Sequence, residues 1–148
     1  MTIMHIGEPA PVLALTQVGG GFVDLAALRG RPVWVIFVAS TCAECPADLR
    51  LMADYVARYS GDGLVGIVVD VGESESVAAA FARRSGITLP IGLDLDGHAR
   101  DAWEVVGLPA HVWVDRLQVV RDVAPASIGA ESMAASLALI LPGVTVTP

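Results

Sequence analysis

The two cysteines of the chain, Cys42 and Cys45, are separated by only two residues. They follow an apolar run, Pro32–Ala39, and precede a stretch with helical spacing, so we expect them at a junction between strand and helix. The N-terminus of a helix favours an anion and lowers the pKa of a nearby thiol. In that position Cys42 can attack a disulfide as a thiolate, and Cys45, one turn later, can release the mixed disulfide.

Two other uses of the cysteine pair have to be weighed. A purely structural disulfide closing four residues gains little, roughly 1.9 kcal/mol from loop entropy. A zinc site needs four ligands, and none of the three histidines has metal-ligand spacing to the pair; these are His5, His98 and His111. We therefore expect redox chemistry that uses no metal and no other cofactor.

Length and composition limit the classes of protein to which this chain can belong. The chain has 148 residues, 54% of them hydrophobic, so we expect one folded domain over residues 1–148. Its longest apolar stretches fall short of the ~18 residues that a membrane span needs. Residues 1–5 have neither the basic nor the apolar region of a signal peptide, so none is visible in this sequence. Nine basic against 16 acidic residues exclude a phosphate-binding nucleic-acid surface.

Turn signals divide the chain into alternating strands and helices. A hairpin is expected around the glycines 19–21, followed by one helical turn at Leu25–Leu28. The further expected strands are Pro32–Ala39, Leu64–Asp70, Leu89–Leu93, His111–Asp115 and Val119–Val123, and the expected helices are Ala43–Tyr59, Ser74–Arg84, Gly97–Val106 and Ala130–Leu141. This order predicts an α/β domain with a mixed sheet.

Three segments resemble the thioredoxin-like TlpA/ResA family of thiol–disulfide oxidoreductases, which is related to the AhpC/TSA–redoxin superfamily. They are Gly7–Pro11, Phe37–Cys45 and Gly107–Asp115, and the similarity covers a core of about residues 7–141. The resemblance implies a thioredoxin fold, with a central mixed β-sheet flanked by helices, an N-terminal β-hairpin and a central αβ insertion at about Glu73–Leu95. It also implies protein disulfides or dithiols as substrates, an upstream thiol electron donor and an extracytoplasmic location, with a cytoplasmic one left open. We expect a monomer.

The resemblance also assigns roles to individual residues. Cys42 would be the attacking cysteine and Cys45 the resolving one. Pro109 would be a cis-proline facing them, and the backbone of Leu108 would pair with an extended substrate strand; the alternative is a trans proline that begins a strand. Asp48 takes the place of a family Glu. It would accept a proton with a raised pKa, or else only stabilise the helix dipole by about 0.3–1 kcal/mol.

Three positions depart from the family pattern. Thr41 replaces the usual Trp, so an aromatic lip for substrate is missing. Glu44, between the cysteines, places a like charge near the thiolate, worth roughly 2 kcal/mol at an effective dielectric of 20. This charge would raise the thiolate pKa and make the disulfide harder to reduce, which favours a reductant or electron relay over a strong oxidant. His111 would either tune a thiol or be an ordinary packed or solvated strand histidine.

Two further functions remain open at this point. A peroxiredoxin-type thiol peroxidase shares the opening pattern and would use Cys45 as its peroxidatic cysteine, although that family has Thr where this chain has Cys42 and an Arg that Leu108–Val114 lacks. The other is a non-enzymatic thioredoxin-like binding module or metallochaperone, in which Cys42 would be dispensable.

Overall fold

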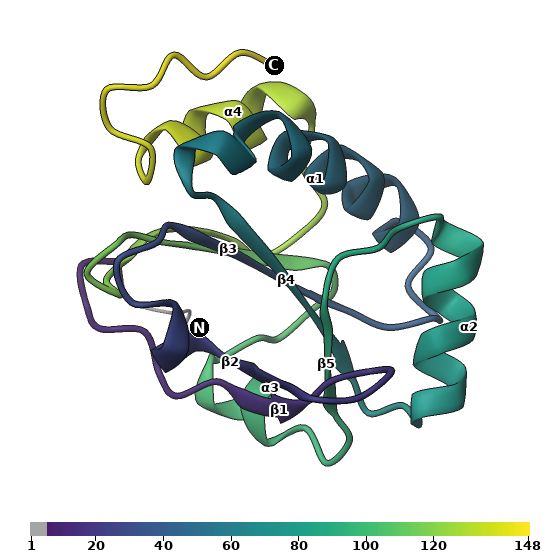
Figure 1. Cartoon of the computed structure of the whole chain (residues 1–148). Helices are drawn as coiled ribbons and strands as arrows, with labels where there is room; N and C mark the ends of the chain where they lie inside the picture. Colours follow the sequence, from purple (N-terminus) through teal and green to yellow (C-terminus); the bar gives the residue numbers. More distant parts are fainter. Residues whose placement is uncertain (1–5) are drawn as a thin grey trace.

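A five-stranded mixed sheet forms the centre of the protein (Figure 1). The computed structural model describes residues 6–148, so His5 and the segment assessed for a signal peptide lie outside the described residues. In spatial order the strands are β5 (Ile91–Asp94), β4 (Val65–Val71), β3 (Val33–Val38), β6 (Ala110–Val114) and β7 (Val120–Ala124). β3, β4 and β5 run parallel, whereas β6 and β7 are antiparallel to their neighbours.

The central strand β3 is buried along its whole length. It lies between β4 and β6 and is covered on both faces, which is why its sequence is apolar at every position rather than at alternate ones. Its alternate side chains therefore belong to two separate cores, with Trp34, Ile36 and Val38 on one face and Val33, Val35 and Phe37 on the other.

Helices cover one face of the sheet, and the N-terminal hairpin with a short helix covers the other (Figure 1). The first face packs against α1 (Cys45–Tyr59), α2 (Glu75–Ser85) and α4 (Ala130–Ala138), and a 3₁₀ turn, η2 (Ser60–Asp62), follows α1. The second face packs against β1 (Ala14–Thr16), β2 (Phe22–Asp24), the 3₁₀ turn η1 (Leu25–Leu28) and α3 (His98–Ala102). The expected hairpin and the α2–β5 insertion are both present.

Element boundaries differ from the expected ones where local chemistry intervenes. α1 begins at Cys45 rather than Ala43, because Pro46 lacks an N–H and fits only in the first helical turn. α3 ends at Ala102 rather than Val106, since Trp103 leaves helical geometry and Glu104 has a φ of 55°. β5 begins at Ile91, two residues late, just after Pro90. α4 ends at Ala138, and tighter i→i+3 bonds continue to Leu141.

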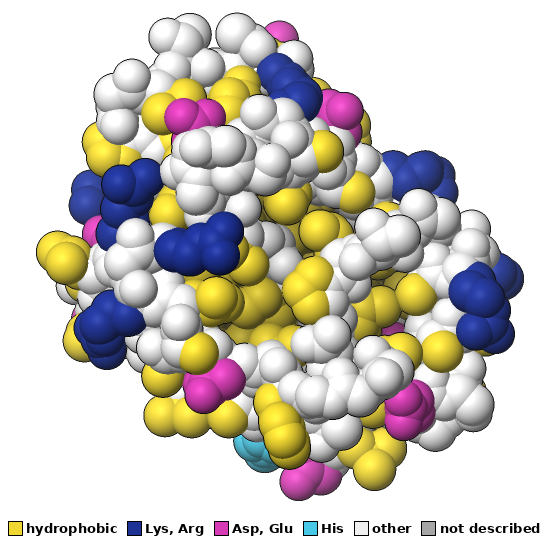
Figure 2. Space-filling model, in the orientation of Figure 1, with side chains coloured by type: hydrophobic (Ala, Val, Ile, Leu, Met, Phe, Trp, Pro, Cys, Tyr) yellow, Lys and Arg dark blue, Asp and Glu magenta, His cyan; other side chains and the backbone are white. Residues whose placement is uncertain are grey.

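The face drawn in Figure 2 is hollowed at its centre, where hydrophobic side chains gather. A cavity of ≈ 230 Å³ between the hairpin and the sheet is lined by residues that include Phe22, Val65 and Pro90. Val65 pairs with Val33 at the start of β3, whereas the cysteines follow its end, so this cavity lies at the opposite end of the sheet from them. Among residues 6–148, no helix is both long enough and apolar enough to cross a membrane.

Candidate active site

Cys42 and Cys45 form a disulfide where β3 leads into α1. The Cys42 N–H donates to the Ala39 carbonyl (3.1 Å), so Cys42 lies in a turn just before the helix rather than within its first turn. Cys42 is half-buried, whereas Cys45, the first residue of α1, is fully buried. An attacking thiol from solvent can therefore reach Cys42 but not Cys45.

The loop before β6 lies against the cysteine turn. The Leu108–Pro109 peptide bond is cis, as the resemblance implies. Because Ala110 pairs with Phe37, Pro109 falls one position further on, next to the end of β3 from which the cysteine turn emerges. Leu108 and Cys42 pack against the same core cluster. Thr41 is exposed beside them, so the structure brings this predicted set of residues to one end of the sheet.

Asp48 lies beneath the cysteine pair, one helical turn after Cys45, and is 2% exposed. Its carboxylate accepts three hydrogen bonds: from the His111 Nε2–H (2.8 Å), from the Ser127 hydroxyl (2.6 Å) and from the Ile128 N–H (3.3 Å). An ionised carboxylate offers about four acceptor positions. The buried Asp48 charge is thus nearly saturated with donors.

Trp34 fixes the orientation of the His111 ring. The indole N–H is only a donor, and it lies 3.0 Å from His111 Nδ1, which must therefore accept. The ring proton of the neutral imidazole is then on Nε2, where it points at Asp48. The contact with Trp34 therefore fixes the orientation of the buried His111 ring and directs its Nε2–H at Asp48.

The expected raised pKa of Asp48 is wrong in direction. Burial by itself raises the pKa, but the hydrogen bonds from His111, Ser127 and Ile128 and the attraction of His111 outweigh it, so the pKa of Asp48 lies below its ordinary value. Glu44 lies between the cysteines, is exposed and makes no capping hydrogen bond to α1. Water and salt weaken the field of an exposed charge, and its effect on the thiolate stays a prediction.

His111 is a packed strand histidine, but its two hydrogen bonds connect it to the site. The sequence pattern did not predict this chain of contacts, because Trp34 and Ser127 lie 77 and 79 residues from their partners, His111 and Asp48. A Trp inside an apolar strand gives one signal, since a buried indole N–H needs an acceptor. Nothing in the local sequence marks Ser127.

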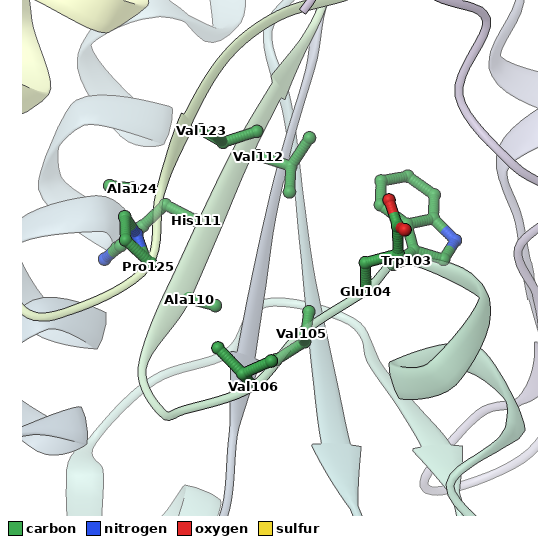
Figure 3. Close-up of a pocket in the computed structure, with 10 residues that line it drawn as sticks. All are labelled: Trp103, Glu104, Val105, Val106, Ala110, His111, Val112, Val123, Ala124 and Pro125. Carbon is green, nitrogen blue, oxygen red and sulfur yellow. The ribbon is translucent and has the colours of Figure 1, made fainter. Parts of the chain in front are cut away.

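A small cavity lies where the ends of β6 and β7 meet the loop after α3 (Figure 3). It measures ≈ 20 Å³, which is room for about one water molecule. Its lining is mainly apolar and includes Val106, Ala110 and Val123. A protein substrate must therefore lie on the surface at this end of the sheet rather than enter the cavity.

Asp94, Asp96 and His98 are close enough together to hold a metal ion, and they contain neither cysteine. Asp94 has a structural role, because its carboxylate accepts hydrogen bonds from the N–H groups of Ala99 and Arg100 at the start of α3 (2.9 Å each). This acidic group is separate from the disulfide and contributes nothing to it.

A disulfide between cysteines with two residues between them, at the junction of the central strand of a mixed sheet and the first long helix, defines the class of thioredoxin-like thiol–disulfide oxidoreductases. The chain belongs to the AhpC/TSA family, whose model matches residues 6–123.

Comparison with individual proteins agrees with this class. The chain is 27% identical over 139 residues to the thiol-disulfide oxidoreductase ResA of Bacillus subtilis (strain 168), covering 94% of this chain and 78% of that protein. It is 28% identical over 141 residues to ResA of Geobacillus kaustophilus (strain HTA426), covering 95% and 81%. A Chlorobium tepidum protein assigned as the thiol:disulfide interchange protein DsbE has the same fold, with a TM-score of 0.87, 23% identity and coverage of 94% and 99%.

Proposed function

We propose that this protein exchanges its Cys42–Cys45 disulfide and dithiol with protein disulfides, and that it acts as a reductant or electron relay rather than as a strong oxidant. The observation that carries this proposal is the difference in exposure within the pair: Cys42 is half-buried at the surface and Cys45 is sealed beneath it. The Cys42 thiolate attacks a substrate disulfide, and Cys45 then attacks the mixed disulfide, so that the substrate leaves reduced and the pair is oxidised.

The remaining predicted residues take supporting roles in this proposal. An extended substrate strand would pair with the backbone of Leu108 beside the cis Pro109 and lie along the exposed Thr41. Asp48 would accept the proton that Cys45 releases when it attacks. Because its pKa is lowered, Asp48 would hold that proton only transiently and pass it to the departing thiolate.

The charge of Asp48 supports the proposed direction of electron flow, from this protein to its substrate. Asp48 is buried, ionised and one helical turn from Cys45, and a nearby anion disfavours a second negative charge. The charge on Asp48 therefore destabilises the thiolate form of the reduced cysteines. The reduced pair then gives up its electrons more readily, which makes it a better electron donor. The exposed Glu44 would add a weaker effect of the same sign.

A redox titration tests the direction. Oxidised protein equilibrated with dithiothreitol or glutathione buffers should show a midpoint potential close to the thioredoxin value of about −270 mV, rather than the value of about −120 mV typical of a strong oxidant. Alkylation of free thiols followed by mass measurement gives the reduced fraction. A midpoint above about −180 mV would overturn the reductant assignment.

Cys45→Ser tests the exchange reaction itself. Without the resolving thiol, the Cys42 thiolate should attack insulin and remain bound in a mixed disulfide that dithiothreitol cleaves. Non-reducing mass spectrometry should find this adduct with Cys45→Ser and not with the double variant Cys42→Ser/Cys45→Ser. The peroxidase function is favoured if no adduct forms and if the wild type turns over hydrogen peroxide steadily while Cys45→Ser does not.

Partners and location follow from the same proposal. The substrates would be proteins with an accessible disulfide, and re-reduction of the pair would need an upstream thiol donor. We propose an extracytoplasmic location for the reaction, since the TlpA/ResA resemblance implies it, and a monomeric protein with one domain.

A further inference from the structure

Glu73 holds the turn that presents Cys42. It lies in the connection between β4 and α2, and its carboxylate accepts the Ser40 N–H (2.9 Å) and the Ser40 hydroxyl (2.5 Å). Ser40 is the residue after Ala39, whose carbonyl closes the turn with the Cys42 N–H. Ser40, two residues before the attacking cysteine, is therefore held by two hydrogen bonds that it donates to one carboxylate, one from its backbone and one from its side chain.

Asp70 lies behind Glu73 and is 1% exposed. It pairs in register with Val38 at the end of β3 and points to the same face of the sheet as Val68, which is the face that also contains Cys45. No N–H or O–H group of residues 6–148 donates to either oxygen of Asp70. A buried carboxylate without any donor is strongly disfavoured.

Asp70 does contact one polar group, the carboxyl group of Glu73. Two carboxyl groups form a hydrogen bond only when one of them carries a proton. Burial, followed by the hydrogen bond to Glu73 and repulsion from it, raises the pKa of Asp70 to about 8. Burial by itself would raise the pKa of Glu73 as well. The hydrogen bonds from Asp70 and Ser40 outweigh burial, so the pKa of Glu73 lies below its ordinary value. The proton therefore belongs to Asp70 and the charge to Glu73.

We propose that Asp70 and Glu73 share one proton and act together as a positioning pair for Cys42. While the proton is present, Asp70 donates to Glu73, and Glu73 holds Ser40 and the turn before Cys42. When the proton is lost to solvent at alkaline pH, the buried Asp70 anion faces the half-buried Glu73 anion, the hold on Ser40 weakens, and reaction of the disulfide with a thiolate slows. The proposal rests on the proposed function in that it concerns the same disulfide.

The route for the proton runs through Glu73. Glu73 is half-buried and lines an open cavity of ≈ 330 Å³ together with Thr16 and Leu93, so it meets solvent while Asp70 does not. The helices that cover this face carry further charged groups, of which Arg84 on α2 attracts Glu73; the others are Asp48, Arg50, Asp54 and Arg58 on α1 and Glu75 and Arg83 on α2. Asp70→Asn leaves all of these in place and keeps an N–H donor for Glu73, so it isolates the shared proton.

The test is the rate at which dithiothreitol reduces the oxidised protein between pH 6.5 and 9.5. Dithiothreitol loses two electrons and closes its own disulfide while Cys42–Cys45 opens to the dithiol, so no protein substrate is involved. Each rate is divided by the dithiothreitol thiolate concentration. In the wild type this corrected rate should fall about threefold to tenfold around pH 8, as the loss of roughly one hydrogen bond that positions the Cys42 turn would cause. In Asp70→Asn it should stay level.

Two controls separate positioning from structure. Glu75→Gln removes an exposed carboxylate two residues from Glu73 and should keep the wild-type profile. Glu73→Gln should react more slowly at every pH and lose the inflection. Superimposable profiles for wild type and Asp70→Asn would overturn the proposal. A confirmed inflection in a protein that forms no insulin adduct would instead refute the proposed function and leave the positioning pair intact.

Discussion

Cys42→Ser is expected to reduce the catalysed reduction of insulin disulfides to the rate of dithiothreitol alone. Cys42 is the half-buried member of the pair and Cys45 is fully buried, so no second thiol can take over the attack. A hydroxyl is not ionised near neutral pH, and removal of a covalent nucleophile costs up to ~10⁶ in other enzymes. We expect a loss on the order of 10³-fold or more, measured as the rate of insulin precipitation.

Ala43→Ser is the matched control for this variant. It introduces the same hydroxyl one residue away, at an exposed position, and should keep the wild-type rate. A Cys42→Ser protein that reduces insulin as fast as the wild type would contradict the exchange reaction and favour a non-enzymatic binding module. Circular dichroism of both variants shows whether the fold is retained.

Asp70→Asn is expected to change how the stability of the protein depends on pH. The pKa of Asp70 rises from 3.8 to about 8 on folding, because the side chain is buried beside Glu73. Between these values the folded protein binds a proton that the unfolded chain does not. The stabilisation that this proton gives to the folded protein is therefore fully present below about pH 4. It is lost as the pH rises to about 8, and the free energy of unfolding falls by about 1.4 kcal/mol per pH unit.

The variant has no such proton to lose, so the difference in unfolding free energy between Asp70→Asn and the wild type should grow in favour of the variant from pH 5 to pH 8. Across this range it should reach several kcal/mol. Urea denaturation of both proteins at each pH measures it, and Glu75→Gln should follow the wild type. A difference that does not change with pH would show that Asp70 is ionised in the folded protein.

Much of the fold could be predicted because its signals are local. The uninterrupted apolar run of β3, the glycines of the hairpin and Ser74, which caps α2 through the Val77 N–H, each act within a few residues. Predicted boundaries failed where one residue overrules a periodic pattern, as Pro46 does at the start of α1 and Glu104 does after α3.

Spacing and hydrophobic pattern, which are properties of neighbouring residues, were enough to predict the reactive pair, its place between strand and helix and a mixed-sheet α/β domain, and the family resemblance added the thioredoxin fold. The electrostatics of the site depend on contacts between distant segments. Asp48 is ionised because His111 and Ser127 reach it from distant segments, and Asp70 holds a proton because Glu73 is the one polar side chain that it meets among the described residues. The pKa of a buried group depends on which donors surround it in space, and the order of residues along the chain does not contain that information.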